Sequence, residues 1–489
     1  MIKYVSTRNE EKEVTCSEGI IDGLANDGGL YVPIIENEKI DLNRLVNSSY
    51  QDIAYTILSK LMTNFTSEEI KECIAKAYDE KWDDSLIVPV TKYSNGYIAE
   101  LWHGPTSAFK DIALTILPQF MRVAYKKENF KDRILILTAT SGDTGKAALA
   151  GFKDVENTNI IVFYPSEGVS SIQKRQMNTS LGNNVDVVAV EGNFDDCQRM
   201  VKEASTSEEM NNNYLNISIS SANSINLGRL VPQIVYYFSS YMQLVNNNEI
   251  QLGDKVNFSV PTGNFGNILA GYLAKQLGLP INKLICASNM NHILSDFFKT
   301  GKYSLDREFY TTISPSMDIL ISSNLERLLF LFSDSKTVKK LMTSLKDNKE
   351  YKIPKEMLEK MNEEFLAGWT SEEECKKTIK KFYEEENILI DPHTAVALNI
   401  SEKYYDEKIP TITLSTASPY KFSSDVIACL KDEEAVDGLD ALNSLNELTG
   451  IRIPQNLLDI YELPIRFTET INKNDGLSTI LKKMEDMNV

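Results

Sequence analysis

Starting at about residue 130, the chain alternates between short runs of β-branched and aliphatic residues and segments with a helical period. Six runs are strand-like: RILILTAT (133–140), NIIVFYP (159–165), VDVVAVEG (185–192), VNFSVP (256–261), KLICASN (283–289) and TITLSTA (411–417). Helix-period segments lie between them: KAALAGFKD (146–154), DDCQRMVKEA (195–204), LVPQIVYYFSSYMQLV (230–245) and NILAGYLAKQLG (267–278). This alternation is typical of βαβ units, so we predict an α/β fold with two parallel-sheet domains.

The amino-terminal part and one internal stretch follow other patterns. Residues 1–95 hold mostly helical patterns, in YQDIAYTILSKLM (50–62) and SEEIKECIAKAYDEKW (67–82), plus the turn-rich LANDGGLYVP (24–33). Between about 335 and 390 the composition shifts to Lys and Glu with apolar residues at helical spacing, which indicates a solvated, amphipathic helical insertion. We predict a helical amino-terminal extension at 1–95 and α/β domains at 96–245 and 246–489, the last carrying the insertion.

Charge and hydropathy narrow the class of protein. The 489 residues include 51 basic and 69 acidic ones, and the resulting net charge of −18 argues against nucleic acid and anionic membranes as partners. The charged amino terminus lacks an apolar core, and no stretch approaches the roughly 18 apolar residues that a membrane span needs. We therefore predict a cytoplasmic protein that captures anionic ligands at local sites.

Cysteine and histidine spacing argues against disulfides and metal sites. The six cysteines are widely scattered without a CxxC pair, as is typical of a reducing compartment. His103, His292 and His393 lie far apart in the sequence, and no HExxH or other metal-ligand spacing occurs. We expect neither a disulfide nor a bound metal.

A glycine-containing loop follows the strand-like run at 256–261. Gly263 and Gly266 would let several backbone N–H groups and the positive end of the next helix converge, which suits a phosphate. A simple tight turn is the alternative. The loop is not a dinucleotide fingerprint, because GxGxxG is absent.

A second loop, TATSGDTG (138–145), lies between a strand-like run and a helix-period segment. Its hydroxyls and amides suit a carboxylate or a phosphate, with ordinary helix N-capping as the alternative. The loop does not match a nucleotide-binding P-loop. Thr140 stands where the first glycine is needed, and Ala147 follows Lys146 in place of Ser or Thr.

Lys110 is the third candidate. It follows Phe109 in IAELWHGPTSAFKDIALTILPQF (98–120) and opens a helical pattern with aliphatic residues on one side. An ordinary lysine there would extend its amine to water. A buried lysine is different, because desolvation lowers its pKa and supplies the neutral amine that a Schiff base requires.

These stretches carry a resemblance to a known family. HGPTSAFKD (103–111), TSGDTG (140–145) and GNFGN (263–267), together with GLANDGGLYVP (23–33), NSINLGR (223–229), DPHTAV (391–396) and LSTASPYKF (414–422), resemble threonine synthases of the tryptophan-synthase-β-like group. The resemblance implies the two-domain α/β fold of that group and pyridoxal 5′-phosphate as cofactor. It also implies conversion of O-phospho-L-homoserine and water to L-threonine and phosphate, a lyase reaction.

The resemblance further implies roles in cofactor binding. Lys110 would be the Schiff-base lysine and the acid/base that moves protons among Cα, Cβ and C4′, with Phe109 beside it in the cofactor site. Asp143 would contact the face or the 3′-oxygen of the pyridine ring, and Thr416 would hydrogen-bond the ring nitrogen. The cofactor phosphate would be held by the loop residues Gly263, Asn264, Phe265, Gly266 and Asn267.

Substrate roles follow in the same way. Ser141, Gly142 and Thr144 would receive the carboxylate. Arg229, with Asn226 and Lys421, would receive the substrate phosphate, because a fork of donors matches its oxygens. Ser418 and Tyr420 stand where many relatives have His and Ala, so the phosphate end of the site is expected to be built differently here.

Two other functions stay open as alternatives. A sister enzyme such as threonine dehydratase would share Lys110 and the glycine loop but would not require Arg229. A non-catalytic binding protein of the same fold would be expected to lose Lys110. We expect a monomer, with a dimer as the alternative.

Overall fold

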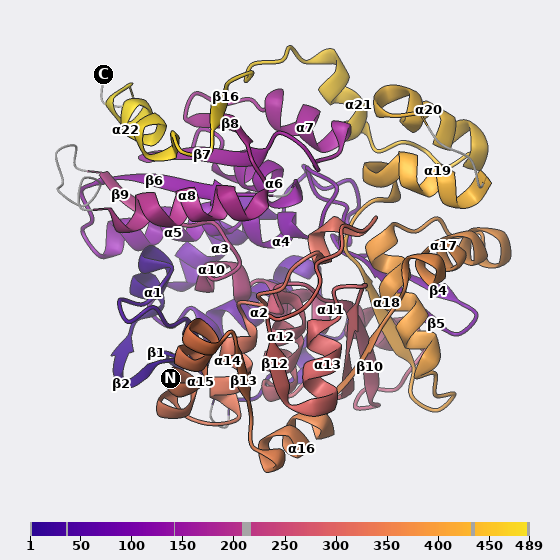
Figure 1. The fold of residues 1–489 in the computed structure, drawn as a ribbon. Helices are drawn as coiled ribbons and strands as arrows, with labels where there is room; N and C mark the ends of the chain where they lie inside the picture. Colours follow the sequence, from indigo (N-terminus) through magenta and orange to yellow (C-terminus); the bar gives the residue numbers. More distant parts are fainter. Residues whose placement is uncertain (1, 36–37, 141, 208–216, 432–435, 487–489) are drawn as a thin grey trace.

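The computed structural model describes residues 2–35, 38–140, 142–207, 217–431 and 436–486 (Figure 1). Two sheets with helices packed around them dominate the fold, and a smaller sheet with its own helices lies at the amino-terminal end. The predicted α/β fold with parallel sheets is confirmed. None of the helices in the described ranges is long and apolar enough to cross a membrane.

The five-stranded sheet is parallel throughout. Its strands, in spatial order, are β16 (Thr470–Asn472), β8 (Val185–Glu191), β7 (Thr158–Pro165), β6 (Arg133–Ala139) and β9 (Ile217–Ser220). The helices that alternate with these strands or pack beside them are α4 (Lys110–Leu114), α5 (Leu117–Lys127), α6 (Asp143–Phe152), α7 (Ser171–Asn178), α8 (Phe194–Thr206) and α22 (Gly476–Asp486).

The six-stranded sheet is parallel except at one edge. Its spatial order is β14 (Phe365–Trp369), β11 (Ile281–Ser288), β10 (Val256–Pro261), β15 (Thr411–Ser415), β5 (Gly96–Glu100) and β4 (Val90–Tyr93), with β4 antiparallel to β5. The helices of this half are α10 (Leu227–Leu230), α11 (Gln233–Asn246), α12 (Gly266–Gln276), α13 (Ile293–Thr300) and α18 (Pro392–Lys403). Every residue of β10 and β15 is buried, as expected for strands covered on both faces.

The amino-terminal extension contains the predicted helices α2 (Tyr50–Leu61) and α3 (Ser67–Ala77), as well as α1 (Cys16–Asp22) and the short η1 (Leu42–Leu45). It also contains an antiparallel sheet, β2 (Asn9–Val14), β1 (Lys3–Ser6) and β3 (Tyr31–Ile34), that the sequence pattern does not predict. The reason is that β2 reads NEEKEV and is almost wholly exposed, so it lacks the apolar alternation of a half-buried strand.

The stretch at 335–390 is only partly the predicted helical insertion. It includes α15 (Ser335–Asn348), α16 (Lys355–Glu364) and α17 (Glu372–Glu386), but residues 365–369 between them form β14, the parallel edge strand of the larger sheet. The antiparallel pair of β12 (Lys302–Ser304) and β13 (Glu350–Lys352) lies between α13 and α15, and α14 (Leu325–Leu331) packs against α15. The sequence pattern did not predict the five-residue strand FLAGW, because the helices on either side of it are rich in Lys and Glu.

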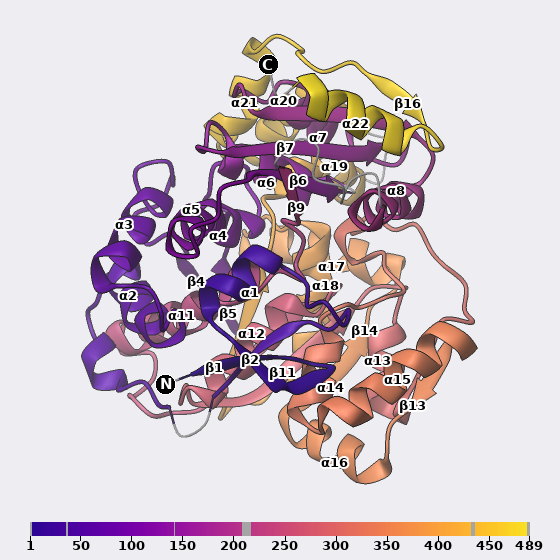
Figure 2. The same ribbon diagram turned by 90° about the vertical axis from the view of Figure 1, so that its left-hand side faces the viewer.

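The sheets also draw strands from both sides of the predicted domain boundaries. Residues 96–100 form β5 in the larger sheet, although they were grouped with the strands of the smaller one. Residues 470–472 form β16, which pairs with β8 nearly 300 positions earlier (Figure 1). Figure 2 shows the carboxyl-terminal elements β16 and α22 beside the sheet that contains β7. After β15, the chain returns from the larger sheet to the smaller one through four helical elements: η3 (Pro419–Phe422), α19 (Ser423–Lys431), α20 (Gly438–Thr449) and α21 (Gln455–Glu462).

The topology explains why the sequence motifs meet. Five motif-bearing loops each begin at the carboxyl end of a parallel strand, namely β5, β6, β9, β10 and β15. In open parallel sheets this end is where ligands bind, because the loops and the amino termini of the following helices converge there. The fold therefore brings stretches more than 300 residues apart to one place.

Candidate active site

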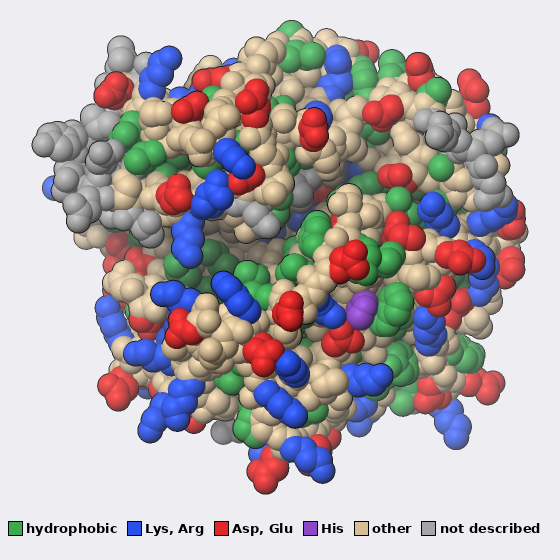
Figure 3. All heavy atoms as spheres, viewed as in Figure 1, with side chains coloured by type: hydrophobic (Ala, Val, Ile, Leu, Met, Phe, Trp, Pro, Cys, Tyr) green, Lys and Arg blue, Asp and Glu red, His purple; other side chains and the backbone are tan. Residues whose placement is uncertain are grey.

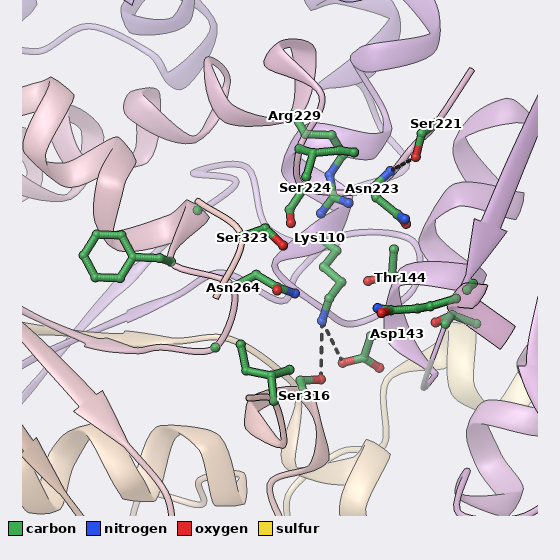
Figure 4. Close-up of a pocket in the computed structure, with 18 of the residues that line it drawn as sticks. Lys110, Asp143, Thr144, Ser221, Asn223, Ser224, Arg229, Asn264, Ser316 and Ser323 are labelled. Atoms are coloured by element: carbon green, nitrogen blue, oxygen red, sulfur yellow. Dashed lines mark hydrogen bonds and ion pairs between the residues drawn. The ribbon is translucent and has the colours of Figure 1, made fainter. Parts of the chain in front are cut away.

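A cavity of about 1160 Å³ opens between the two large sheets. It is hollowed into the face seen in Figure 3, and its interior is enlarged in Figure 4. The lining includes residues of the lysine motif, the start of α6, α8, the segment 217–229, the glycine loop and the segment 315–323, together with His393 and Thr416. Residues from all three candidate motifs thus share one cavity.

Lys110 reaches into this cavity from the start of α4. The backbone before it is tied to the β15 loop, because the N–H of Phe109 donates to the carbonyl of Thr416 at 2.9 Å. The Lys110 side chain is 11% exposed, and its Nζ lies 3.6 Å from Oδ2 of Asp143 and 3.4 Å from Oγ of Ser316. Burial lowers the pKa of Lys110, with Asp143 opposing the shift, so the structure favours the neutral amine that the sequence predicts.

Asp143 opens α6 and carries the negative charge nearest to Lys110. Its Oδ1 accepts from Nζ of Lys421 at 2.6 Å and from Nε2 of Gln173 at 2.8 Å. Burial acts to raise the pKa of Asp143, but the ammonium group of Lys421 holds it well below its usual range. The carboxylate is therefore ionised at neutral pH.

The glycine loop is built as an anion cradle. Phe265 adopts a left-handed conformation (φ 63°), which turns the chain from β10 into the amino terminus of α12. The first N–H groups of a helix have no partner within the helix and are free for a ligand. The amide oxygen of Asn267 accepts from Tyr236 and Tyr237, while its Nδ2 is buried and has no hydrogen-bond partner among the described residues. Asn267 lines the cavity, and its unpaired amide donor suits an anion bound beside it.

Gly263→Ala is expected to destabilise the folded chain. A Cβ at this position would lie 2.8 Å from the backbone oxygen of Ser316, so the segment carrying Ser316 would have to move. Overpacking of this kind costs about 1–3 kcal/mol. Thermal unfolding measures the loss, with Gly266→Ala as the matched control, because a Cβ there meets nothing nearer than 3.4 Å. Equal losses in the two variants would contradict the close approach at Gly263.

Arg229 presents a second cationic group to the cavity. It lies in α10 and is 3% exposed. Nη1 donates to the carbonyl of Ala222 at 2.8 Å, and Nε has no hydrogen-bond partner within the described part of the chain. Burial lowers the pKa of Arg229 to about 10, so the guanidinium remains charged at neutral pH. Figure 4 shows it directed into the cavity beside Asn223 and Ser224, an arrangement that suits an anion separate from the one at the glycine loop.

Most of the residues predicted for the site line this cavity. They are Phe109, Lys110, Asp143, Thr144, Arg229, Gly263, Asn264, Phe265, Gly266, Asn267 and Thr416. Gly142 lies next to the cavity without lining it. Ser141 lies outside the described residues.

Asn226 and Lys421 are placed differently from the prediction. The amide of Asn226 donates to the carbonyls of Ile20 and Ser221 and caps α10 through its oxygen, so it holds the loop in shape. Lys421 is completely buried behind Asp143 and also donates to the carbonyl of Thr106. Neither residue lines the cavity, which corrects the expectation that they contact the substrate phosphate directly.

Sequence reasoning assigned no role to the segment 315–318 or to His393. Nε2 of His393 accepts the backbone N–H of Ser316 at 3.2 Å, and Nδ1 lies 2.6 Å from Asp391, so the Nδ1–H form donates to that carboxylate. His393 thus supports the segment that places Ser316 beside Lys110. The motif DPHTAV, which contains Asp391 and His393, was the one sequence feature that could have pointed to His393. No motif in the sequence pointed to Ser316.

Comparisons with known proteins agree with this geometry. Three family models match the chain: "Threonine synthase N terminus" at residues 3–78, "Pyridoxal-phosphate dependent enzyme" at 97–410 and "Threonine synthase, C-terminal" at 394–480. Threonine synthase-like 1 of Homo sapiens is 40% identical over 458 residues, covering 88% of this chain and 61% of that protein. Threonine synthase of Saccharomyces cerevisiae is 37% identical over 460 residues, covering 86% and 88%.

The solved structures add a similarity over the whole length. The structure of threonine synthase from Brucella melitensis with bound pyridoxal phosphate superposes with a TM-score of 0.88 at 34% identity and covers 100% of both chains. The present chain spans only 58–61% of the length of the four mammalian threonine synthase-like 1 relatives.

Proposed function

The chain belongs to the threonine synthase family, and from that premise we propose that it converts O-phospho-L-homoserine and water to L-threonine and phosphate with pyridoxal 5′-phosphate bound through Lys110. One observation carries the proposal. A buried amine with a lowered pKa and a buried guanidinium with an unused donor face the same cavity, next to a cradle for a second anion. An acidic protein thereby offers separate sites for a cofactor phosphate and a substrate phosphate.

The residues present fit the cofactor. Lys110 provides the amine for its aldehyde, and the glycine loop with the unpaired Nδ2 of Asn267 provides donors for its phosphate. Thr416 lines the cavity and offers a neutral hydroxyl for the ring nitrogen. When bound, pyridoxal phosphate supplies an electron sink that stabilises negative charge on the substrate carbon next to the amino group.

The chain's own groups then bind the substrate and move its protons. Lys110 would take the proton from Cα, and the loss of a Cβ proton would let phosphate leave from Cγ. Arg229 would hold that phosphate as it leaves, apart from the glycine loop, so that the two phosphates do not compete. Thr144 and the amino-terminal end of α6 would receive the carboxylate. The two protons removed from carbon would return to Cγ, which becomes the methyl group, and to Cα. Water would add its hydroxyl at Cβ and give its remaining proton to the released phosphate, so the reaction balances.

The proposal is tested by incubating the purified protein and cofactor with O-phospho-L-homoserine and measuring threonine and inorganic phosphate. Equal amounts of the two products are expected. L-threonine is the control substrate, because a sister dehydratase would convert it to 2-oxobutyrate and ammonia. Formation of 2-oxobutyrate from threonine, without phosphate release from O-phospho-L-homoserine, would overturn the assignment.

We also propose that the protein acts in the cytoplasm as a monomer, with a dimer as the alternative, and without nucleic acid or membrane partners. All six cysteines are buried and none of them forms a disulfide, which suits a reducing compartment. The net charge of −18 repels polyanions.

A further inference from the structure

Two lysines share one buried carboxylate beneath the cavity. Oδ1 of Asp143 lies 2.6 Å from Nζ of Lys421, and Oδ2 lies 3.6 Å from Nζ of Lys110. The Lys421 side chain is 0% exposed and has a second acceptor, the carbonyl of Thr106 at 2.9 Å. Lys110 is 11% exposed, and its other partner is a hydroxyl, that of Ser316, at 3.4 Å.

A buried site of this kind cannot hold both lysines as ammonium groups at low cost. One negative charge neutralises one positive charge, and a second, uncompensated cation carries a large desolvation penalty. The lysine with the shorter ion pair and the additional acceptor keeps its proton. By these distances that lysine is Lys421, and Lys110 is the one that gives its proton up.

We propose that Lys421 is a positioning residue that pairs with Asp143 and neutralises its negative charge. The amine of Lys110 is then left neutral and able to form a bond with an aldehyde. Without Lys421, the same carboxylate would pair with Lys110 and hold it as an ammonium, which cannot attack a carbonyl. The inference rests on the proposed cofactor chemistry and assigns Lys421 a place in it, although Lys421 does not line the cavity.

Other charged groups face these two lysines. Arg229 adds positive charge near Lys110 and also favours the neutral amine. Lys421 lies near Asp111 and Lys146 as well. His393 faces the segment of Ser316, and Asp318 lies on that segment. Among these groups, Asp143 is the one ion-paired with both lysines, so the effect of Lys421 is expected to pass mainly through that carboxylate.

The test measures the pKa of Lys110 in the full chain freed of cofactor. Trace acylation at a series of pH values, read by mass spectrometry of the Lys110 peptide, reports the fraction of neutral amine. Lys421→Met is expected to raise the pKa of Lys110 by about one unit or more, which lowers the neutral fraction at pH 7 about tenfold. The rate at which cofactor is captured at pH 7 is expected to fall by the same factor.

Two variants serve as controls. Lys421→Arg restores a cation beside Asp143 and is expected to keep the acylation profile near that of the original chain. Lys146→Met removes a neighbouring lysine of α6 that bonds Ser180 and not Asp143, and it is expected to shift the Lys110 profile much less. If Lys421→Met does not fold, Lys421→Gln takes its place, because the amide retains a donor for Thr106.

The same substitution in an Asp143→Asn background completes the test. In this background the carboxylate is absent. Replacing Lys421 is therefore expected to shift the pKa of Lys110, measured by acylation, by less than half of the shift seen with Asp143 present. An unchanged profile in a folded Lys421 variant, or an equal shift in both backgrounds, would overturn the proposal. Because acylation needs no substrate, its outcome is separate from the turnover that tests the proposed function.

Discussion

Lys110→Ala is expected to abolish conversion of O-phospho-L-homoserine and the covalent attachment of the cofactor. No other amine among the described residues lines the cavity as deeply, and the alanine provides neither a bond to the aldehyde nor a base for Cα. Loss of a covalent catalytic group costs about 10³-fold or more in turnover. Phosphate release measures the rate, and mass spectrometry after borohydride reduction measures the adduct.

The fold should survive this substitution. Burial already disfavours the ammonium form of Lys110, so removing the amine does not remove a strong stabilising charge. Lys126→Ala is the matched control, since this lysine is exposed in the last turn of α5 and is expected to leave turnover and adduct unchanged. A borohydride-stable adduct at the original level in Lys110→Ala would refute the assignment.

Arg229→Ala is expected to lower kcat/KM for O-phospho-L-homoserine while leaving cofactor absorbance nearly intact. The guanidinium is buried, charged and has an unused Nε donor, so a phosphate held there loses a charge-assisted contact. Such a contact contributes roughly 1.5–3 kcal/mol, or about tenfold to a hundredfold in rate. Arg229→Lys should rescue only partly, because an ammonium lacks the planar fork.

The specificity of this effect is checked with unphosphorylated homoserine. Its affinity, measured from the change in cofactor absorbance, should be almost the same in the original chain and in Arg229→Ala.

Arg199→Ala removes an arginine at the mouth of the same cavity that is half exposed and paired with Asp196 at 2.8 Å, so it is expected to change kcat/KM less than about threefold. Equal losses for both ligands in Arg229→Ala would show that Arg229 does not bind the phosphate.

The local elements of this fold were predictable because their signals are short-range. The runs at 133–140, 159–165, 185–192, 256–261, 283–289 and 411–417 all contain strands of the two sheets. Continuous apolar runs of this length are typical of parallel strands covered on both faces. Short strands without that signature, β2 among charges and β14 between charged helices, were not predicted.

The sequence by itself predicted two parallel-sheet domains and three loops with candidate chemistry, because apolar period and turn chemistry act between near neighbours. Most of the residues that the family resemblance implies for the site line the cavity. Only the tertiary structure decided which polar side chains reach the cavity and which serve the framework behind it. Lys421 and Asn226 have the donors that a phosphate site needs, yet they bond to Asp143 and to Ile20, respectively. These partners lie more than 200 residues away, and a donor binds whichever acceptor the completed fold places within its reach.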